Sequence, residues 1–397
     1  MSKARVGGDW LEGPDTQAVL SMLSGAGFRG LVVGGCVRNA LMDLPVTDVD
    51  IATDAPPQTV IALSQAAGLQ AVPTGLAHGT VTIIAGGKGH EVTTFRDDIE
   101  TDGRHARVAF STDLRADAAR RDFTMNALYA QADGQVLDPL GIGLADLRAR
   151  RLRFVGVPAD RITEDYLRIL RFFRFSAYYS DPVQGFDADA LAACAAHGAG
   201  LQGLSHERVG AEMRKLLDAP DPGPAIAAMD RTQVLARVLP GARPDALARL
   251  IRLEAGEPGP WLRRLAALGG KDPAARFRLS RAEARALDAV QAAVAGTDSA
   301  AVLGYRLGAG RAVDAVLVRA ACSGGPPEPG WQDAIAVGAR AVFPLRPADL
   351  MPALTGPALG AALERAKAHW LASGFRPGRD ALQAVALGDQ AGPRQDD

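Results

Sequence analysis

The chain has 397 residues, of which 48% are hydrophobic and 22% are charged, a composition typical of a folded protein. This length exceeds what one hydrophobic core usually supports, so we expect two to four domains. The net charge of −1 excludes a protein-wide positive field, and any surface that attracts nucleic acid must therefore be local.

The sequence predicts a cytoplasmic protein that does not enter a membrane. Its longest apolar runs, such as residues 31–37, are far too short to span a bilayer. The first fifteen residues lack the apolar core of a secretory signal. The three cysteines, Cys36, Cys194 and Cys322, are far apart and lack the spacing of a metal site, which favours a reducing compartment.

Helix and strand signals are mixed in the first third of the chain. We expect helices at 16–26, at 36–43 and after Pro57, because proline is tolerated in a first helical turn. We expect strands in these segments: 30–35, 47–53, and 79–85 with 90–96 as a hairpin. This α/β part ends near residues 137–143. Helical periodicity follows, with Pro/Gly-rich breaks at 218–224, 256–260 and 323–330.

Two aspartates, Asp48 and Asp50, lie two residues apart on a predicted strand and would point to the same face. Paired carboxylates are ligands that Mg²⁺ prefers, and Glu91 on a neighbouring predicted strand is a candidate third ligand. An exposed strand face is the alternative. The preceding Gly34 and Gly35 favour the metal interpretation, because glycines let backbone N–H groups approach a phosphate that Arg38 could also contact. The order of glycines and acids does not match the G-x-G-x-x-G spacing of a dinucleotide-binding oxidoreductase.

Two further clusters are rich in arginine. Residues 120–129, "RRDFTMNALY", contain Arg121, Asp122 and Asn126, which could contact a triphosphate and a ribose or simply flank a core. Residues 161–175 place acidic and basic side chains at i, i+3 steps of a predicted helix. These side chains are Asp165, Arg168, Arg171 and Arg174. An Asp acceptor beside an Arg donor matches the edges of cytosine and adenine and disfavours uracil and guanine. An intrahelical ion pair is the alternative.

The order and spacing of these segments resemble class II CCA-adding tRNA nucleotidyltransferases of the polymerase-β-like superfamily. The segments that carry the resemblance are "GGCVRN…TDVDIAT", "GLAHGTV", "EVTTFR", "ETDGRHA", "RRDFTMNAL", "LDPLGIGLADL", "EDYLRILRFFRF" and "LSHERVGAEMRKLL". Residues 349–374 resemble the tRNA-binding tail of that family. The resemblance is dense through about residue 217 and looser to about residue 375.

The resemblance implies an α+β fold. A small mixed α/β nucleotidyltransferase head with a short β-sheet would be followed by an elongated all-helical neck, body and tail. The implied domains are a catalytic, Mg²⁺-binding head at 1–140, a base-reading neck at 141–217, a body at 218–275 and a tRNA-binding tail at 276–397. Residues 97–108 match the disordered loop of that family, which is thought to help the switch from C to A addition.

The resemblance also implies residue roles. Asp48 and Asp50 would hold two Mg²⁺ ions, and Gly35 and Arg38 would bind the triphosphate. Arg121, Asp122 and Asn126 would contact the triphosphate and the ribose. Asp165 and Arg168 would read the base. Arg171 and Arg174 would hold phosphates and maintain the geometry of the base-reading side chains. Asn39 departs from the family pattern, which has Asp at that position.

The implied reaction adds C, C and A from CTP and ATP to the 3′ end of tRNA, without a template and with release of pyrophosphate. Poly(A) polymerase activity and partial CC or A addition are the alternatives within the family, and a non-catalytic RNA-binding protein is the alternative outside it. No DNA partner is expected.

Overall fold

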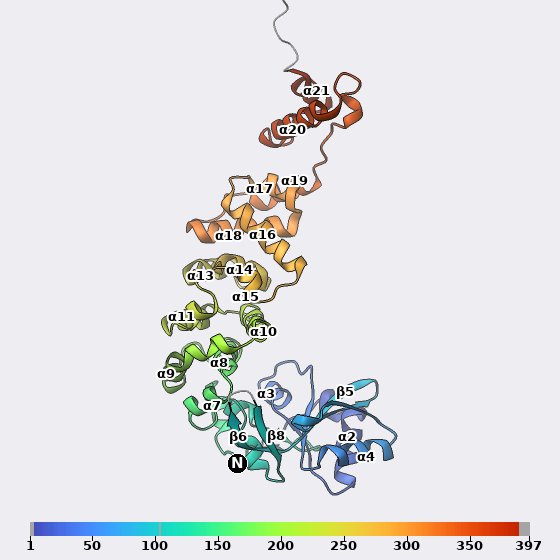
Figure 1. Cartoon of the computed structure of the whole chain (residues 1–397), viewed down its shortest axis with the longest axis vertical. Helices are drawn as coiled ribbons and strands as arrows, with labels where there is room; N and C mark the ends of the chain where they lie inside the picture. The colour runs from blue at the N-terminus through green and yellow to red at the C-terminus, as the bar shows by residue number, and fades with distance from the viewer. Residues whose placement is uncertain (1–3, 103–104, 389–397) are drawn as a thin grey trace, which may run out of the picture. The chain divides into compact units, whose positions relative to one another are not determined.

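The computed structural model describes residues 4–102 and 105–388, and it divides into two compact units, Met1–Pro240 and Gly241–Asp397 (Figure 1). The first unit contains all the strands of the described chain and the second is helical. The predicted α+β class, with a mixed head followed by helices, is confirmed. The four domain boundaries predicted from the sequence remain predictions.

A seven-stranded mixed sheet forms the centre of the first unit, in the order β3-β4-β5-β2-β1-β8-β9. The strands are β1 (Gly30–Val33), β2 (Asp50–Thr53), β3 (Gln70–Gly75), β4 (Thr80–Ala85), β5 (Lys88–Thr94), β8 (Tyr129–Ala130) and β9 (Val136–Leu137). β2 and β5 run parallel, and the other neighbouring strands run antiparallel. The predicted hairpin of β4 and β5 is confirmed, with a turn at Gly86 and Gly87, which both have positive φ.

Helices cover this sheet because they carry apolar residues at helical spacing. Their bounds are α1 (Asp9–Glu12), α2 (Pro14–Gly25), α3 (Gly35–Leu41), α4 (Pro57–Ala66), η1 (Leu76–His78), α5 (Leu114–Ala119), η2 (Thr124–Asn126) and α6 (Gly143–Arg148). Val19, Leu20 and Leu23 of α2 are buried, and α2 contacts α4 and strands β1, β4 and β5. Burial of such side chains typically contributes about 1.5–3 kcal/mol each.

The segment predicted to be a disordered loop is largely a β-hairpin. β6 (Arg96–Asp102) pairs antiparallel with β7 (His105–Phe110), and residues 103–104 between them lie outside the described residues. The expectation of disorder at 97–108 is therefore corrected for the two strands. The physical reason is the alternation of β-formers on both sides of the Asp-Gly turn signal, a pattern that favours a hairpin.

The rest of the first unit is a group of helices, several of which Figure 1 labels in green. Their bounds are α7 (Pro158–Glu164), α8 (Leu167–Tyr179), α9 (Ala188–His197), η3 (Gly198–Gly203), α10 (His206–Leu217), α11 (Gly223–Arg231) and α12 (Val234–Val238). α8 buries one face through residues such as Phe172 and Phe175. Phe123 lies 5.1 Å from the Phe175 ring and Phe154 lies 5.6 Å from the Phe172 ring, measured between centroids, so these two residues join α8 to the part of the unit that contains the sheet.

The second unit consists of helices that pack side to side. They are α13 (Pro244–Leu253), α14 (Trp261–Leu268), α15 (Pro273–Arg276), α16 (Arg281–Ala295), α17 (Ala300–Leu307), α18 (Ala309–Ser323), α19 (Trp331–Arg340), η4 (Pro347–Asp349), α20 (Gly356–Ala372) and α21 (Arg379–Leu387). Trp370 lies at the centre of an aromatic cluster with Tyr305, Phe343 and Phe375. In the described part of the chain, the helices are all too short or too polar to cross a membrane.

Candidate active site

Two carboxylates face each other at the parallel pair of strands in the sheet. Asp50 begins β2 and is directly paired with Glu91 of β5. Both side chains are exposed. Asp48 precedes β2 rather than lying on it, so the prediction of a strand that begins at residue 47 is wrong. Asp48 is nevertheless close enough to Asp50 to raise the pKa of that carboxylate. Within the described residues, the segment from Pro45 to Val49 has no strand partner.

The electrostatics of these carboxylates favour a cation. Burial, Glu91 and Asp48 all raise the pKa of Asp50, while Arg121 opposes the rise. Like charges raise a carboxylate pKa because they disfavour its ionised form, and a nearby cation would relieve that cost. The donor set is all carboxylate oxygen, which suits Mg²⁺. Within residues 4–102 and 105–388, however, the side chains do not form a preassembled group of three metal ligands. Asp48 instead accepts a hydrogen bond from the Thr47 hydroxyl at 3.0 Å.

Arg121 lies beside the glycine turn, and hydrogen bonds to Asp117 and Tyr129 hold its guanidinium group in place. Gly34 has a φ of 75°, a conformation that glycine adopts without strain. A Cβ at Gly34 would lie 3.5 Å from Nη1 of Arg121. The Arg121 Nη2 donates to buried Asp117 at 3.0 Å, and its Nε donates to the Tyr129 hydroxyl at 2.9 Å. Tyr129 in turn donates to Asp117 at 2.6 Å. One guanidinium nitrogen therefore remains directed to the turn.

A chain of hydrogen bonds joins Arg38 to the second predicted cluster. Arg38, which is buried, donates through Nη1 to the Asn126 side-chain oxygen, and Asn126 donates through Nδ2 to Asp122 at 2.9 Å. Arg38 also donates to the Tyr179 hydroxyl at 2.8 Å, with its guanidinium 4.0 Å from the Tyr179 ring centroid. Burial lowers the pKa of Arg38, although the pKa of a guanidinium remains far above neutrality. The structure thus brings Arg38, Asp122 and Asn126 together.

The structure explains how Asn39 is accommodated. Its side-chain oxygen accepts hydrogen bonds from Nε and Nη2 of Arg38, at 3.1 and 2.8 Å. Its Nδ2 donates to the Pro45 carbonyl at 2.8 Å. An aspartate could make the first pair of bonds but could not donate to Pro45. Asn39 therefore ties the buried arginine to the loop that leads to Asp48.

Arg171 and Arg174 project from α8 toward the same network. Arg171 donates to Asp122 through Nε at 2.9 Å and through Nη2, and Arg174 lies 2.8 Å from Glu212 of α10. Burial works against ionisation of Asp122, but Arg171 and the hydrogen bond from Asn126 outweigh it and hold its pKa below the usual range. Three guanidinium groups, those of Arg38, Arg171 and Arg174, lie 4.5–5.1 Å from the Phe175 ring centroid.

The structure does not pair Asp165 with Arg168. Asp165 ends α7 and precedes α8, so the prediction that it shares one helix with the three arginines is wrong. Its Oδ1 accepts a hydrogen bond from the Leu167 amide at 3.1 Å, which caps the start of α8, and its Oδ2 accepts from Arg208 at 2.8 Å. Arg168 donates instead to Glu164 and to the Arg161 carbonyl. Both predicted base-reading side chains therefore have protein partners in the nucleotide-free chain.

Comparisons with known proteins show which sequences and folds this chain resembles. Residues 31–153 match the Poly A polymerase head domain, and residues 186–245 match the Probable RNA and SrmB- binding site of polymerase A. The CCA-adding enzyme of Streptococcus pyogenes serotype M1 is 40% identical over 227 residues, 57% of this chain and 54% of that protein. Human CCA tRNA nucleotidyltransferase 1, mitochondrial, is 42% identical over 187 residues, 47% of this chain and 43% of that protein.

The likeness to a solved structure extends further. The Bacillus stearothermophilus CCA-adding enzyme in complex with CTP superimposes with a TM-score of 0.72 at 28% identity, covering 95% of this chain and 97% of that one. The chain is therefore similar in sequence to CCA-adding enzymes over about half of its length and similar in fold to one of them over most of it. It spans about half the length of the curated relatives that it matches.

Sequence reasoning missed several residues that position the side chains of this site. They are Asp117, Tyr129, Tyr179, Glu212 and Arg208, which hold Arg121, Arg38, Arg174 and Asp165 as described above. Asp117 and Arg121 are four residues apart, a spacing typical of helical ion pairs, and that signal could have identified the first pair. The other contacts join residues far apart in the sequence and carry no local signal.

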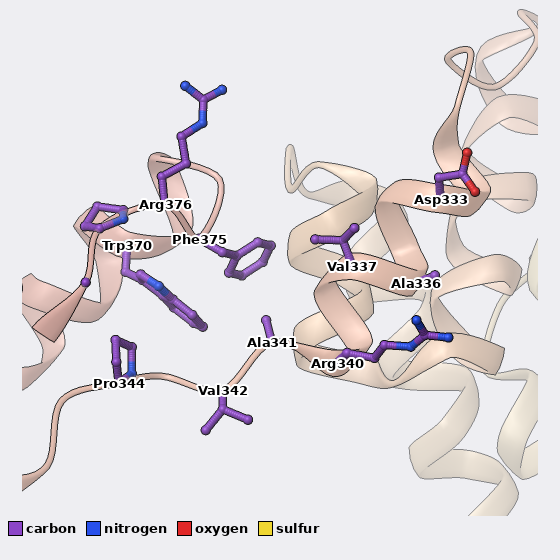
Figure 2. Close-up of a pocket in the computed structure, with 12 residues that line it drawn as sticks. Asp333, Ala336, Val337, Arg340, Ala341, Val342, Pro344, Trp370, Phe375 and Arg376 are labelled. Carbon is purple, nitrogen blue, oxygen red and sulfur yellow. The ribbon is translucent and has the colours of Figure 1, made fainter.

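The second unit has a groove of about 720 Å³ beside α19 and the tail helices (Figure 2). Val337 and Val342 give it apolar walls, and Phe375 extends toward α19 from the tail side. Arg340 and Arg376 lie on opposite sides of the groove. An aromatic ring between two guanidinium groups is an arrangement that suits single-stranded nucleic acid.

Proposed function

We propose that this protein is a CCA-adding tRNA nucleotidyltransferase. The observation that carries the proposal is the arrangement in the first unit, where the carboxylates Asp50 and Glu91 lie at one edge of a network that contains Arg121. Acidic residues beside arginines suit the transfer of a nucleotide from a triphosphate, because the acids hold a metal ion and the arginines hold phosphates. The likeness to an enzyme solved in complex with CTP supports this substrate class.

In the proposed reaction, the 3′-hydroxyl oxygen of tRNA bonds to the α-phosphorus of CTP or ATP. The bond from that phosphorus to the pyrophosphate oxygen breaks, and the hydroxyl loses its proton. Two Mg²⁺ ions, when held by Asp48, Asp50 and Glu91, would lower the pKa of the hydroxyl and stabilise the leaving pyrophosphate. The amides at Gly34 and Gly35, with Arg38 and Arg121, would hold the triphosphate. Asp122 and Asn126 would fix the ribose end of that site through the hydrogen bonds described above.

Base selection is the part of the proposal that requires movement of side chains. Asp165 would accept a hydrogen bond from the amino group of cytosine or adenine, and Arg168 would donate to the adjacent ring nitrogen. In the nucleotide-free chain, Arg168 donates to Glu164 and Asp165 accepts from Arg208. We therefore infer that an incoming base draws Arg168 away from Glu164, while Arg208 keeps Asp165 in place. Arg171 and Arg174 would stabilise α8 and contact phosphates.

The helical parts would bind tRNA. We propose the head at 1–140, the base-reading neck at 141–217, the body at 218–275 and a tRNA-binding tail at 276–397. The groove that contains Phe375, Arg340 and Arg376 supports a role of the tail in RNA binding. A cytoplasmic location, and the absence of a DNA partner, remain predictions from the sequence.

The experiment that tests the proposal is sequencing of the 3′ ends made by purified protein from tRNA that lacks CCA, with CTP, ATP and Mg²⁺. We expect C, C and A to be added and extension then to stop. Repeated addition of adenosine would indicate a poly(A) polymerase, and products that stop at CC, or that gain only A on tRNA ending in CC, would indicate a partial enzyme.

A matched pair of variants tests the catalytic assignment. Asp48→Ala should abolish incorporation of labelled CTP, because it removes a proposed metal ligand. Asp43→Asn changes an exposed aspartate of the preceding turn and should leave incorporation intact. Undiminished incorporation by the Asp48 variant would end the two-metal proposal.

A further inference from the structure

A small cavity lies apart from the nucleotidyltransfer site, between α8, the segment that follows it and the beginning of α11. Its volume is about 120 Å³, the space of a few non-hydrogen atoms. Its walls are mostly apolar and include Ala177, Phe186 and Pro224. No residue in this cavity is part of the carboxylate and arginine network described above.

A buried hydroxyl in this cavity lacks a partner. Ser176 of α8 lines the cavity and is only 7% exposed. A helical serine commonly donates to the carbonyl four residues earlier, but within the described residues Ser176 Oγ makes no hydrogen bond. Leaving a buried hydroxyl unpaired is unfavourable, so a ligand that pairs with it would gain that interaction.

Two carboxylates also line the cavity. Asp181 accepts hydrogen bonds from the Val183 amide at 2.9 Å and from Gln184, and Asp221 accepts from the Gly223 amide at 2.9 Å. These bonds orient both carboxylates without neutralising them, since neither forms an ion pair within the part of the chain that the structure describes. The cavity therefore combines negative charge, one unpaired hydroxyl oxygen and apolar walls.

We propose that this cavity binds a small primary alkylammonium ion. The ammonium group donates to Ser176 Oγ and to the carboxylates of Asp181 and Asp221, and a short alkyl chain lies against the apolar walls. An inorganic cation would leave those walls without a partner, and a neutral alcohol would leave the carboxylates unneutralised. The ion would join α8 to α11, and α8 is the helix that carries Arg171 and Arg174.

The test uses the full chain, without RNA or nucleotide, and propylammonium chloride observed by ligand-detected NMR. We expect dissociation constants in the millimolar range, because so few atoms make the contacts. Asp181→Asn with Asp221→Asn keeps the acceptors for the backbone amides but removes both charges, and should weaken binding at least tenfold. Asp189→Asn, an exposed aspartate of α9, is the matched control and should bind as the unchanged protein does.

Two control ligands distinguish an alkylammonium ion from other possible occupants of the cavity. Propan-1-ol has the shape of the probe without its charge, and KCl supplies charge without the alkyl chain. Equal binding of propan-1-ol, displacement of propylammonium by K⁺ at equal ionic strength, or undiminished binding by the doubly substituted protein would each overturn the proposal.

Ser176→Ala gives an independent measurement. It should weaken propylammonium binding severalfold, and it should not lower the melting temperature of the ligand-free protein, because the hydroxyl that it removes has no partner there. A lowered melting temperature, or unchanged propylammonium binding, would show that the hydroxyl is satisfied within the protein and would overturn its role as a ligand.

Discussion

Asp50→Asn should stabilise the metal-free protein while it abolishes nucleotidyl transfer. Asp50 and Glu91 are paired on neighbouring strands, whose backbones lie about 4.8 Å apart. Two like charges about 5 Å apart repel each other by roughly 1 kcal/mol in water and by roughly 3 kcal/mol at an effective dielectric constant of 20. Both side chains are exposed, so the lower value applies. A gain of about 1 kcal/mol should raise the melting temperature by roughly 2–4 °C.

The pH dependence of this gain follows from the raised pKa of Asp50. The folded state holds the proton more tightly than the unfolded state does. The associated stability is therefore fully present below the unfolded pKa, about 3.9, and is lost as pH rises through the folded pKa. The unchanged protein thus bears the repulsion at pH 7, and the advantage of Asp50→Asn should shrink as the solution becomes acidic.

Thermal denaturation in EDTA and in Mg²⁺ measures the effect. Mg²⁺ should raise the melting temperature of the unchanged protein more than that of Asp50→Asn, because the variant has lost a proposed ligand. Asp43→Asn controls for the loss of one surface charge. A lower melting temperature for Asp50→Asn in EDTA at pH 7, relative to this control, would refute the repulsion argument.

Three further substitutions test the surrounding contacts. Arg208→Ala should reduce the preference for CTP over UTP severalfold, because Asp165 loses the group that orients it, and steady-state kinetics with both nucleotides measures this preference. The half-exposed ion pair between Arg208 and Asp165 contributes less than about 1 kcal/mol to stability, so the melting temperature should change little. Asn39→Asp should raise the KM for CTP severalfold, because it adds negative charge to the triphosphate site and removes the donor to the Pro45 carbonyl; an unchanged KM would contradict it. Asp122→Asn should cost roughly 3 kcal/mol at pH 7. Because the folded pKa of Asp122 lies below the unfolded value of about 3.9, this contribution is fully present above the unfolded pKa and is lost as pH falls through the folded pKa. Urea unfolding from pH 7 to pH 3 should show the beginning of this decline.

The sequence predicted the local features of the site well. The glycine turn at Gly34, a strand through Asp50 to Thr53, and the hairpin that carries Glu91 each follow from a run of a few residues with a clear periodicity, although the strand was predicted to begin three residues too early. The position of Glu91 on a strand next to Asp50 was also predicted, and the structure places β5 beside β2.

The errors and omissions arise where the outcome depends on contacts between distant segments. Asp165 was predicted to be helical because its spacing from Arg168 is helical, but its side chain instead caps α8 and its carboxylate pairs with Arg208 of α10. Such capping competes with helix continuation and is decided by the tertiary partner. Glu212 and Tyr179 were missed for the same reason, since their partners lie 38 and 141 residues away in the sequence.

The register of β2 against β5 determines which side chain of β5 lies opposite Asp50. Backbone hydrogen bonds, rather than side-chain contacts, bring Asp50 opposite Glu91, and the same register sets Ile51 against Val92 in the core. Side chains alternate between the two faces of a strand, so a slip of one residue would place His90 or Val92, which are both buried, opposite Asp50 and would turn Glu91 inward. A substitution along β5 leaves this register in place, whereas the loss of one residue from the part of β5 that pairs with β2 would shift it. The length of this strand, more than its composition, preserves the acidic edge.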